Sequence, residues 1–271
     1  MLTRLKELRD LEGKIVLITG ASSGVGKLVA FEMATRGATL VLCARHLTEL
    51  RKVAQKCKEL SQHAAYVVQL DVSDSQMIDQ QLIHVLRDIG SVDVLVNSAG
   101  FGLFEPFVEL DMATVEKMFR VNVLGLMYVT QRIAQQMITV KRGQIFNIAS
   151  VAGKIATPKS TAYSATKFAV VGFSNALRLE LKPLGIQVTT VNPGPVETNF
   201  FKTADPSGNY FDRIKLLALS PEKVAHQIVN AVGYKRREIN APLYMELIHR
   251  GYELFPNFGD QLASSQLFNR K

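Results

Sequence analysis

Short apolar runs alternate with amphipathic segments along most of the chain. The runs are nearly continuous in branched aliphatic residues, which is typical of strands buried on both faces of a parallel sheet. They cover residues 14–19, 39–44, 65–70, 92–97, 143–148 and 186–191. Helical periodicity fills the intervals 25–36, 47–61, 75–88, 111–137 and 161–182. This alternation predicts an α/β fold, a Rossmann-type doubly wound parallel sheet of about seven strands with helices on both faces.

The chain has no linker-like stretch and no internal repeat, so we expect residues 1–271 to form a single domain. After residue 193 the pattern loosens. Residues 196–219 mix Pro, Gly, Asn and Asp with aromatic residues, which suits a substrate-binding loop. Ser220 followed by Pro221 predicts the start of a helix. Residues 240–271 form an aromatic-rich C-terminal extension to which the pattern assigns no elements.

Composition narrows the class of protein. The formal net charge is +8, but Lys and Arg are dispersed, so a solvated basic surface is favoured over a nucleic-acid or membrane partner. Two cysteines, Cys43 and Cys57, give no disulfide framework and favour a reducing, cytoplasmic compartment. No apolar run approaches the roughly 18 residues of a spanning helix, and the charged N-terminal residues lack a signal-peptide core. The five His residues show no metal-ligand spacing, so we expect no metal.

A glycine-rich loop follows the first predicted strand and precedes the first predicted helix. It reads TGASSGVG over residues 19–26. Glycine lets backbone N–H groups approach a pyrophosphate, and a helix N-terminus favours its negative charge. The spacing is not the common G-x-G-x-x-G, but the strand–loop–helix position predicts a dinucleotide site. A glycine-rich turn without a ligand is the plainer alternative.

The residue after the second predicted strand bears on which dinucleotide binds. A carboxylate at this point would bind the ribose 2′-hydroxyl of NAD, but the chain has Arg45 there. Arginine can hold a 2′-phosphate through bidentate hydrogen bonds. The sequence therefore favours NADP(H) over NAD(H). The alternative is that Arg45 merely begins a surface helix.

Tyr163 and Lys167 stand four residues apart in a predicted helix, so their side chains share a face. The unperturbed pKa of tyrosine is about 10, and a nearby cation lowers it by about 1–3 units. Lysine would thus make the tyrosine a usable proton donor or acceptor at neutral pH. Taken alone, Tyr163 and Lys167 could equally be an ordinary surface pair. The motifs upstream are what favour a catalytic role for them.

Taken in order, these motifs resemble those of the short-chain dehydrogenase/reductase family, in its compact single-domain branch. They are TGASSGVG at 19–26, LDV at 70–72, NSAG at 97–100, VNV at 121–123, Ser150, YSATK at 163–167 and PGPVET at 193–198. The resemblance extends from about Gly13 to Thr198. Each motif is weak alone, whereas the ordered set is highly specific. Ser98 is a departure, because the family usually has a second asparagine there.

The resemblance implies a role for each matched residue. Tyr163 is the expected catalytic acid/base, and Lys167 lowers its pKa and binds the nicotinamide ribose. Ser150 is expected to hydrogen-bond the substrate oxygen, and Asn122 to hold a water that links Lys167 to a proton relay. The expected cofactor-binding residues are Gly20, Ser22, Ser23, Gly24, Val25, Gly26, Arg45, Asp71, Val72, Asn97, Ala99, Gly100, Tyr163, Lys167, Pro193, Gly194, Val196 and Thr198. Family members are usually dimers or tetramers, with the helices at 111–137 and 161–182 at an interface.

These residues predict an NADP(H)-dependent oxidoreductase that transfers hydride between nicotinamide and a carbonyl or secondary alcohol. An apolar small-molecule substrate is expected, because the substrate side should contain Phe101, Phe104, Val151, Phe200, Phe201, Tyr210 and Phe211. Two alternatives stay open. One is a non-catalytic NADP-binding module with a regulatory or scaffold role. The other is a membrane-surface-associated, lipid-processing reductase, since residues 241–258 are amphipathic, although packing on the domain or across a dimer is favoured for that segment.

Overall fold

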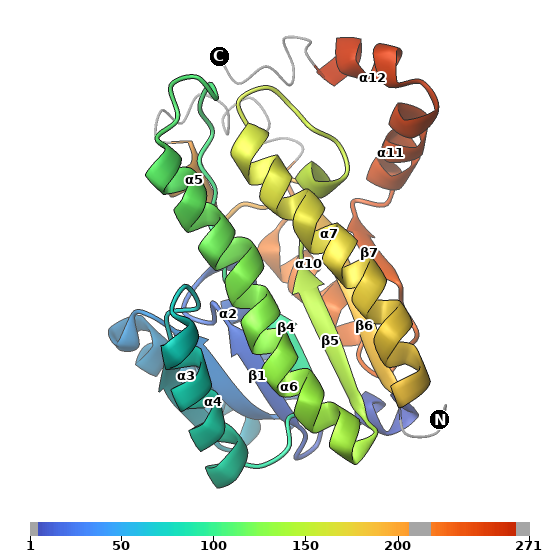
Figure 1. Cartoon of the computed structure of the whole chain (residues 1–271). Coiled ribbons are helices and arrows are strands. Elements are labelled where there is room, and N and C mark those ends of the chain that lie inside the picture. The colour runs from blue at the N-terminus through green and yellow to red at the C-terminus, as the bar shows by residue number, and fades with distance from the viewer. Residues whose placement is uncertain (1–4, 206–217, 264–271) are drawn as a thin grey trace.

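A parallel sheet forms the centre of the computed structural model, which describes residues 5–205 and 218–263 (Figure 1). Within these residues the sheet has seven strands in the order β3-β2-β1-β4-β5-β6-β7, and every neighbouring pair is parallel. The strands are β1 (Ile15–Thr19), β2 (Thr39–Ala44), β3 (Ala65–Gln69), β4 (Val94–Asn97), β5 (Gly143–Ile148), β6 (Ile186–Pro193) and β7 (Glu238–Ala241). The predicted Rossmann-type sheet is confirmed.

Helices cover both faces of the sheet (Figure 1). They are α2 (Gly24–Thr35), α3 (Leu47–Ser61), α4 (Ser75–Asp88), α5 (Met112–Phe119), α6 (Leu126–Val140), α7 (Thr161–Leu181), α8 (Phe200–Ala204), α10 (Pro221–Asn230), α11 (Tyr244–Leu254) and α12 (Pro256–Ala263). Short turns of other helix types are η1 (Glu7–Arg9), η2 (Arg120–Gly125), η3 (Val151–Gly153) and η4 (Lys182–Leu184). Buried residues of α2, α3 and α10 pack on one face of the sheet, and those of α4, α6 and α7 on the other.

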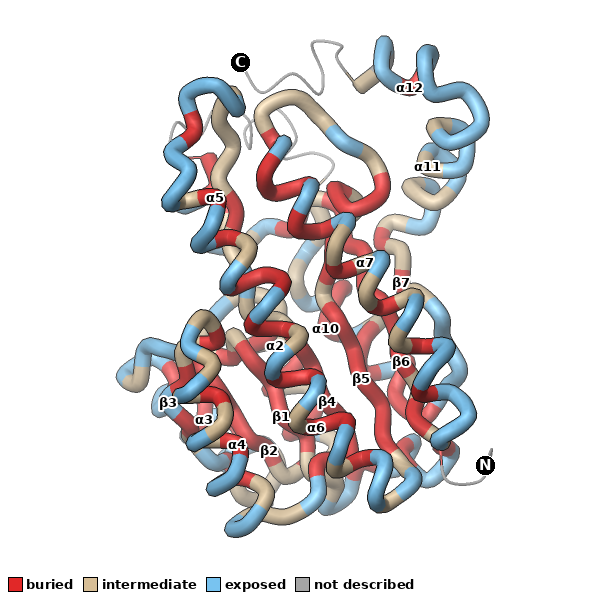
Figure 2. The backbone as a smooth tube through the Cα atoms, viewed as in Figure 1, coloured by how far each residue is buried: buried red, intermediate tan, exposed pale blue. Residues whose placement is uncertain are grey.

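The near-continuous apolar runs follow from this two-sided burial. In β1, Val16 and Ile18 belong to the core under α2 and α10, whereas Leu17 belongs to the core under α4 and α6. Successive side chains of a strand point to opposite faces, so a strand covered on both faces needs apolar residues at every position. Figure 2 shows β1, β2, β4, β5 and β6 as almost entirely buried, whereas the edge strand β3 is partly exposed.

The strand order creates a crevice beside β1. From β1 the chain continues outward through β2 to β3, and it then returns through α4 to β4 on the other side of β1. Thr19 and Asn97 are register partners at the ends of β1 and β4. The loops that follow these two strands therefore lead to opposite sides of the sheet, which leaves a ligand crevice at the carboxyl edge.

The structure departs from the predicted elements in three places, one of which is the C-terminal extension, where α11 and α12 form although the pattern assigned no elements. The predicted helix 111–137 is divided into α5 and α6 by η2, a π-helical turn that contains Asn122. Strand β7 lies where the pattern assigned nothing, because it has only four residues and alternates buried Ile239 and Ala241 with polar neighbours. The predicted helix start at Ser220 is confirmed, and its hydroxyl accepts a hydrogen bond of 3.3 Å from the Lys223 N–H. Tyr210 and Phe211 lie outside the described residues.

Candidate active site

A cavity of about 440 Å³ lies at the carboxyl edge of the sheet and brings together residues from widely separated segments. The predicted site residues that line it are Gly20, Ser22, Ser23, Gly24, Val25, Arg45, Asp71, Val72, Ala99, Gly100, Ser150, Tyr163, Lys167, Pro193, Gly194, Val196 and Thr198. They come from the loops after six strands and from the first turns of α7. Parallel strands end at one edge, which is why positions up to 178 residues apart in the sequence meet here.

Three predicted residues lie behind the cavity wall. Asn97 is buried, and its Nδ2 atom donates to Thr130 Oγ1 at 2.8 Å and to Asn147 Oδ1 at 2.9 Å. Asn122 is buried beneath Phe101. Gly26 packs so closely that a Cβ atom there would lie 2.7 Å from the carbonyl oxygen of Gly20. Their contacts support the loops that line the cavity.

The glycine loop needs its glycines for two different reasons. Gly20 has φ +66°, and an added Cβ would lie 2.8 Å from Ala99 Cα, so the loops after β1 and β4 touch backbone to backbone. Within the described residues, Ser23 stands at the N-cap of α2 without a side-chain hydrogen bond to its first turn. The N–H groups of that turn thus lack a side-chain cap, which suits an anionic group such as a phosphate.

The other end of the cavity combines a cation with a carboxylate. Arg45 is exposed directly after β2, and its carbonyl accepts a hydrogen bond of 3.3 Å from Gln69 Nε2. Burial of the Asp71 carboxyl raises its pKa, but hydrogen bonds from the Ser73 hydroxyl and N–H, with the charge of Arg45, hold the pKa below its usual value. Asp71 therefore stays ionised and is held in place by Ser73.

Lys167 is buried beside Tyr163 on α7. Its Nζ atom donates a hydrogen bond of 2.9 Å to the carbonyl oxygen of Ile148 and lies 5.7 Å from the centroid of the Tyr163 ring. Burial lowers the pKa of the Lys167 ammonium to about 8. The group is thus a cation with weakened hold on its proton, next to a tyrosine ring.

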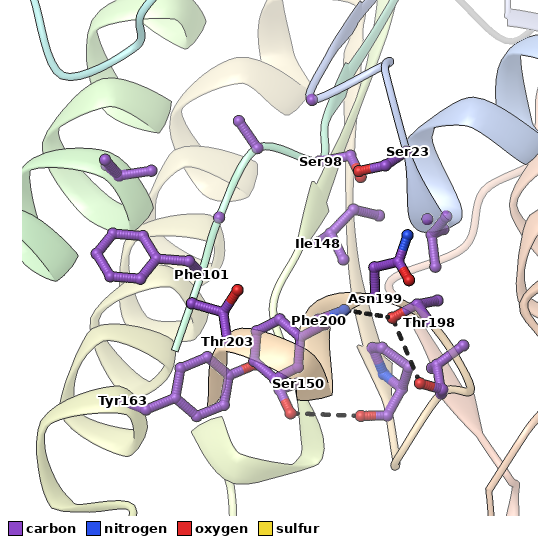
Figure 3. A pocket seen from close by; sticks show the side chains of 18 of the residues that line it. Ser23, Ser98, Phe101, Ile148, Ser150, Tyr163, Thr198, Asn199, Phe200 and Thr203 are labelled. Atoms are coloured by element: carbon purple, nitrogen blue, oxygen red, sulfur yellow. Dashed lines mark hydrogen bonds between the residues drawn. The ribbon is translucent and has the colours of Figure 1, made fainter. Parts of the chain in front are cut away.

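Ser150 is buried two residues after the end of β5, at the N-cap of η3 and on the same cavity wall (Figure 3). Its hydroxyl accepts a hydrogen bond of 3.1 Å from the Ala152 N–H and donates one of 3.4 Å to the carbonyl oxygen of Pro193. The hydrogen bond from Ala152 orients the Ser150 oxygen, whereas the hydrogen bond to Pro193 is long and therefore weak. The hydroxyl hydrogen can therefore be redirected to a ligand at small cost.

Asn122 uses both ends of its amide to hold one residue of the opposite loop. Its Oδ1 accepts from the Phe101 N–H at 3.0 Å, and its Nδ2 donates to the Phe101 carbonyl at 2.8 Å and to Thr166 Oγ1 at 3.1 Å. The π-helical turn η2 widens the helix where this side chain leaves it, as single π-turns do at many functional sites. Asn122 thereby joins the loop after β4 to α7.

Aromatic rings surround Tyr163. The ring centroid of Phe104 lies 5.7 Å and that of Phe200 5.4 Å from the centroid of Tyr163. Phe201 packs on Phe200 at 5.5 Å, and the Phe104 N–H donates to the Ala204 carbonyl at 2.8 Å. All three phenylalanines, with Phe101 and Val151, line the cavity, as expected for the substrate side.

Besides His46, next to Arg45, and Ser98, the polar lining residues Asn199 and Thr203 were not predicted as site residues. They follow Thr198 in and just before α8, whose first residues face the cavity (Figure 3). Their position directly after the motif at 193–198 is the one sequence signal that could have identified them. They add hydrogen-bonding groups to a wall that is otherwise aromatic.

Comparison with known proteins agrees with this geometry. The family model described as short chain dehydrogenase matches residues 14–208. The chain belongs to the short-chain dehydrogenase family. Enzymes of this family use a nicotinamide cofactor, and the glycine loop, Arg45 and Asp71 fit such a group, because the cavity offers an uncapped helix start at one place and an exposed cation at another.

Relatives of this short-chain dehydrogenase cover most of its length. A Xenopus laevis protein named dehydrogenase/reductase SDR family member 7B is 34% identical over 248 residues, which is 88% of this chain and 77% of that protein. An uncharacterized oxidoreductase of Staphylococcus aureus (strain MW2) is 34% identical over 222 residues, 82% of this chain and 92% of the relative.

Solved structures resemble this short-chain dehydrogenase as well. A short-chain dehydrogenase from Streptomyces avermitilis has a TM-score of 0.79 and 27% identity, and the match covers 91% of this chain and 94% of that one. An alcohol dehydrogenase from the archaeon Thermococcus sibiricus, complexed with 5-hydroxy-NADP, has a TM-score of 0.76 and 25% identity, with 84% and 96% covered.

None of the helices in residues 5–205 and 218–263 is long and apolar enough to cross a membrane. In the same ranges, no group of three or more His, Cys, Asp and Glu side chains is arranged to hold a metal ion.

Proposed function

We propose that this short-chain dehydrogenase is an NADP(H)-dependent oxidoreductase that transfers hydride between nicotinamide and a carbonyl or secondary alcohol of an apolar substrate. The observation that carries the proposal is the common wall formed by Ser150, Tyr163 and buried Lys167, in the same cavity as the glycine loop. A purely structural role would not account for the buried Lys167 ammonium, because burying a cation without a carboxylate partner lowers the stability of the fold.

Proton transfer is assigned to Tyr163. During reduction, negative charge grows on the substrate oxygen, and the Tyr163 hydroxyl delivers a proton to it. The cation of Lys167 favours the phenolate that remains. During oxidation the same phenolate accepts the proton of the alcohol. The hydrogen bond from Lys167 to the Ile148 carbonyl keeps the ammonium in position.

Ser150 is assigned to the substrate oxygen. Its hydroxyl turns from the Pro193 carbonyl toward the substrate while the N–H of Ala152 still holds the oxygen atom. A preoriented donor stabilises the developing charge without reorganisation during the reaction. Asn122 acts on this centre through the Phe101 loop, and the water-mediated relay expected from the family remains a prediction.

The cofactor supplies or accepts the hydride, and residues of this chain orient it. The glycine loop and the start of α2 would hold the pyrophosphate, and Asp71 and Val72 the adenine. Arg45 would hold a 2′-phosphate, which supports NADP(H) over NAD(H). The structural relative from Thermococcus sibiricus was solved with 5-hydroxy-NADP, which supports the same choice.

The substrate is proposed to be apolar because the space beside Tyr163 is bounded by Phe104, Phe200 and Phe201. Each buried CH₂ group contributes about 0.8 kcal/mol, or about a fourfold gain in kcat/KM. We therefore expect the kcat/KM of methyl ketones to rise with chain length. A profile that does not change with chain length would contradict an apolar substrate side.

The catalytic proposal is tested by following NADPH oxidation with a panel of ketones and aldehydes. Tyr163→Phe removes only the hydroxyl, so turnover should fall by at least about a thousandfold while NADPH binding, measured by fluorescence titration, is retained. A wild-type protein as inert as Tyr163→Phe across a broad panel would favour a non-catalytic NADP-binding module.

The proposal includes a homodimer or homotetramer in a reducing, cytoplasmic compartment. Leu124, Tyr128 and Phe168 are exposed apolar residues of the η2–α6 and α7 segments, where family members associate. Cys43 and Cys57 are both free thiols and buried, so neither needs an oxidising environment. Light scattering after size-exclusion chromatography should give a mass of two or four chains, and a monomer would contradict the oligomer.

A further inference from the structure

Lys154 is a buried lysine that the proposed proton transfer does not use. Within residues 5–205 and 218–263, Lys154 and Lys167 are the two lysines that are buried. Lys167 lines the cavity, whereas Lys154 lies away from its lining. A buried ion pair stabilises a fold no better than well-packed apolar residues of similar volume. A lysine at this position therefore points to a need for directional contacts.

Two carboxylates from different elements hold the Lys154 ammonium. Its Nζ atom donates a hydrogen bond of 2.5 Å to Glu238 of β7 and one of 2.9 Å to Glu246 of α11. Asn240 Nδ2 donates to the same carboxylates, at 3.3 Å to Glu238 and at 2.9 Å to Glu246. Burial raises the pKa of the Glu238 carboxyl, but the hydrogen bond and the charge of Lys154 hold that pKa below its usual value. The lysine is thus tied to β7 by an ion pair.

Lys154 also ends the turn that begins with Ser150. Ser150 is the N-cap and Lys154 the C-cap of η3. The Gly153 N–H donates to the Ser150 carbonyl, and the Lys154 N–H donates to the Val151 carbonyl, both at 2.9 Å. A single 3₁₀ turn has few internal hydrogen bonds and these have poor geometry, so its position depends on what surrounds it. The Lys154 side chain attaches the turn at the end opposite Ser150.

Strand β7 also holds the group on the other side of the Ser150 hydroxyl. That hydroxyl donates to the carbonyl of Pro193, which ends β6 and is the register partner of Ala241 in β7. The N–H of Gly194 donates to the Ala241 carbonyl at 2.7 Å. Strand β7 therefore fixes Pro193 through its backbone and the turn of Ser150 through the ion pair of Lys154.

The turn touches the helix that carries Tyr163 and Lys167. A Cβ atom on Gly153 would lie 2.6 Å from the Lys167 carbonyl oxygen, so η3 and α7 are in backbone contact. Such a contact resists only movement of the turn toward α7. The hydrogen bonds of Lys154 to β7 and α11 also resist movement away from it. Together they hold the turn in one position relative to Tyr163.

We propose that Lys154 is a positioning residue, which holds the Ser150 hydroxyl at the place where it meets the substrate oxygen protonated by Tyr163. Lys154 acts through the η3 turn and touches no substrate. A displacement of about 1 Å in the site can cost about a hundredfold in rate. The inference rests on the role of Ser150 in the proposed function, but the attachment of the turn is measurable without turnover.

The test is a double-mutant cycle of Lys154→Met and Ser150→Ala, followed by NADPH oxidation with a reactive ketone or aldehyde. Methionine keeps the length of the side chain and removes its charge. We expect Lys154→Met alone to lower kcat about tenfold, with KM and the Kd for NADPH changed less than about twofold. In the Ser150→Ala background, the same substitution should change kcat less than about twofold, because its effect passes through Ser150.

Equal losses of kcat from Lys154→Met in both backgrounds would overturn the proposal, because Lys154 would then support the fold and not Ser150 in particular. A rise in KM at unchanged kcat would overturn it as well. The matched control is Lys52→Met on α3. Lys52 pairs with Glu49 at 2.8 Å, but its side chain is 68% exposed, so all constants should stay those of the wild type.

A milder variant covers the case in which Lys154→Met does not fold, since that substitution leaves two carboxylates without their cation. Glu238→Gln weakens the attachment to β7 and retains the pair of Lys154 with Glu246. It should lower kcat about threefold when Ser150 is present and leave kcat unchanged in the Ser150→Ala background. The same loss in both backgrounds would again overturn the proposal.

Hydrogen exchange without substrate separates this inference from the proposed function. The backbone amides of residues 151–155 should exchange at least about tenfold faster in Lys154→Met than in the wild type, while the amides of β5 keep their protection. Unchanged exchange of residues 151–155 would overturn the inference, whatever the activity. Faster exchange in a protein that turns over no ketone or aldehyde would keep Lys154 as the anchor of the turn and overturn the proposed function instead.

Discussion

The Nζ atom of Lys167 lies over the ring of Tyr163, 5.7 Å from its centroid, while it donates a hydrogen bond to the Ile148 carbonyl. The two side chains leave the same face of α7, as their spacing requires. Ile148 ends β5, so the sheet holds the lysine in place relative to the tyrosine. The proton chemistry proposed for the site thus depends on a contact between a helix and a strand end.

The first prediction concerns the stability cost of Lys167. Its pKa is about 8 in the folded chain, against 10.5 for an unperturbed lysine, so burying the cation costs about 3 kcal/mol below pH 8. Between these pKa values the unfolded chain binds more protons, so this cost falls as pH rises. Lys167→Met removes the cost but leaves the Ile148 carbonyl unpaired. We expect the variant to be more stable by about 1 kcal/mol at neutral pH, although its turnover falls at least about a hundredfold.

The measurement is urea unfolding of both proteins without cofactor, at neutral pH and near pH 10. The advantage of Lys167→Met should shrink as pH rises toward the unfolded pKa. A wild type that is more stable at neutral pH and loses this advantage with rising pH would show that the cation stabilises the fold, contrary to this account.

The second prediction concerns the amide of Asn122. Asn122→Ala leaves the N–H and carbonyl of Phe101 without their partners, so we expect a loss of about 2–4 kcal/mol in unfolding free energy. Because the Phe101 loop borders the cavity, kcat should fall as well. Asn230→Ala is the control, since this exposed asparagine bonds only at the surface and should change stability by less than about 0.5 kcal/mol. Equal effects of both substitutions would contradict the bridging role.

The third prediction uses two glycines. Gly26→Ala places a Cβ 2.7 Å from the Gly20 carbonyl, so the glycine loop must shift, and we expect NADPH affinity to fall at least about tenfold. Gly172→Ala in α7 meets nothing within 4 Å and should leave binding unchanged while stabilising the helix by about 0.5–1 kcal/mol. Fluorescence titration and thermal unfolding measure both. Unchanged binding in Gly26→Ala would show that the loop does not hold the cofactor.

The fourth prediction concerns the choice of cofactor. Arg45→Asp replaces the exposed cation after β2 by a carboxylate, which repels a 2′-phosphate and accepts hydrogen bonds from a 2′-hydroxyl. The Kd for NADPH should rise by at least about tenfold, and that for NADH should change little or fall. Isothermal titration of both cofactors with both proteins gives the four constants. Parallel changes for NADPH and NADH would contradict the role of Arg45.

Much of the fold was predictable because each buried parallel strand gives a nearly continuous apolar run in the sequence. Leu17 and its neighbours are all apolar because both faces of β1 are covered, so the strand is visible without knowledge of its partners. By contrast, β7 is short and alternating, and its place is decided by pairing with β6. The π-turn at Asn122 was not predictable either, because the residues on either side have ordinary helical periodicity.

By itself the sequence determined the alternation of strands and helices, the glycine loop at the first strand–helix junction and the spacing of Tyr163 and Lys167, because each is a local pattern. Only the tertiary structure decided which side chains line the cavity, that burial lowers the pKa of Lys167, and that the leucines of α11 face outward. Each of these depends on contacts between segments far apart in the chain. The helical periodicity around residue 247 is the same whichever side of α11 faces the protein. The ion pair between buried Lys154 and Glu246 decides which side that is.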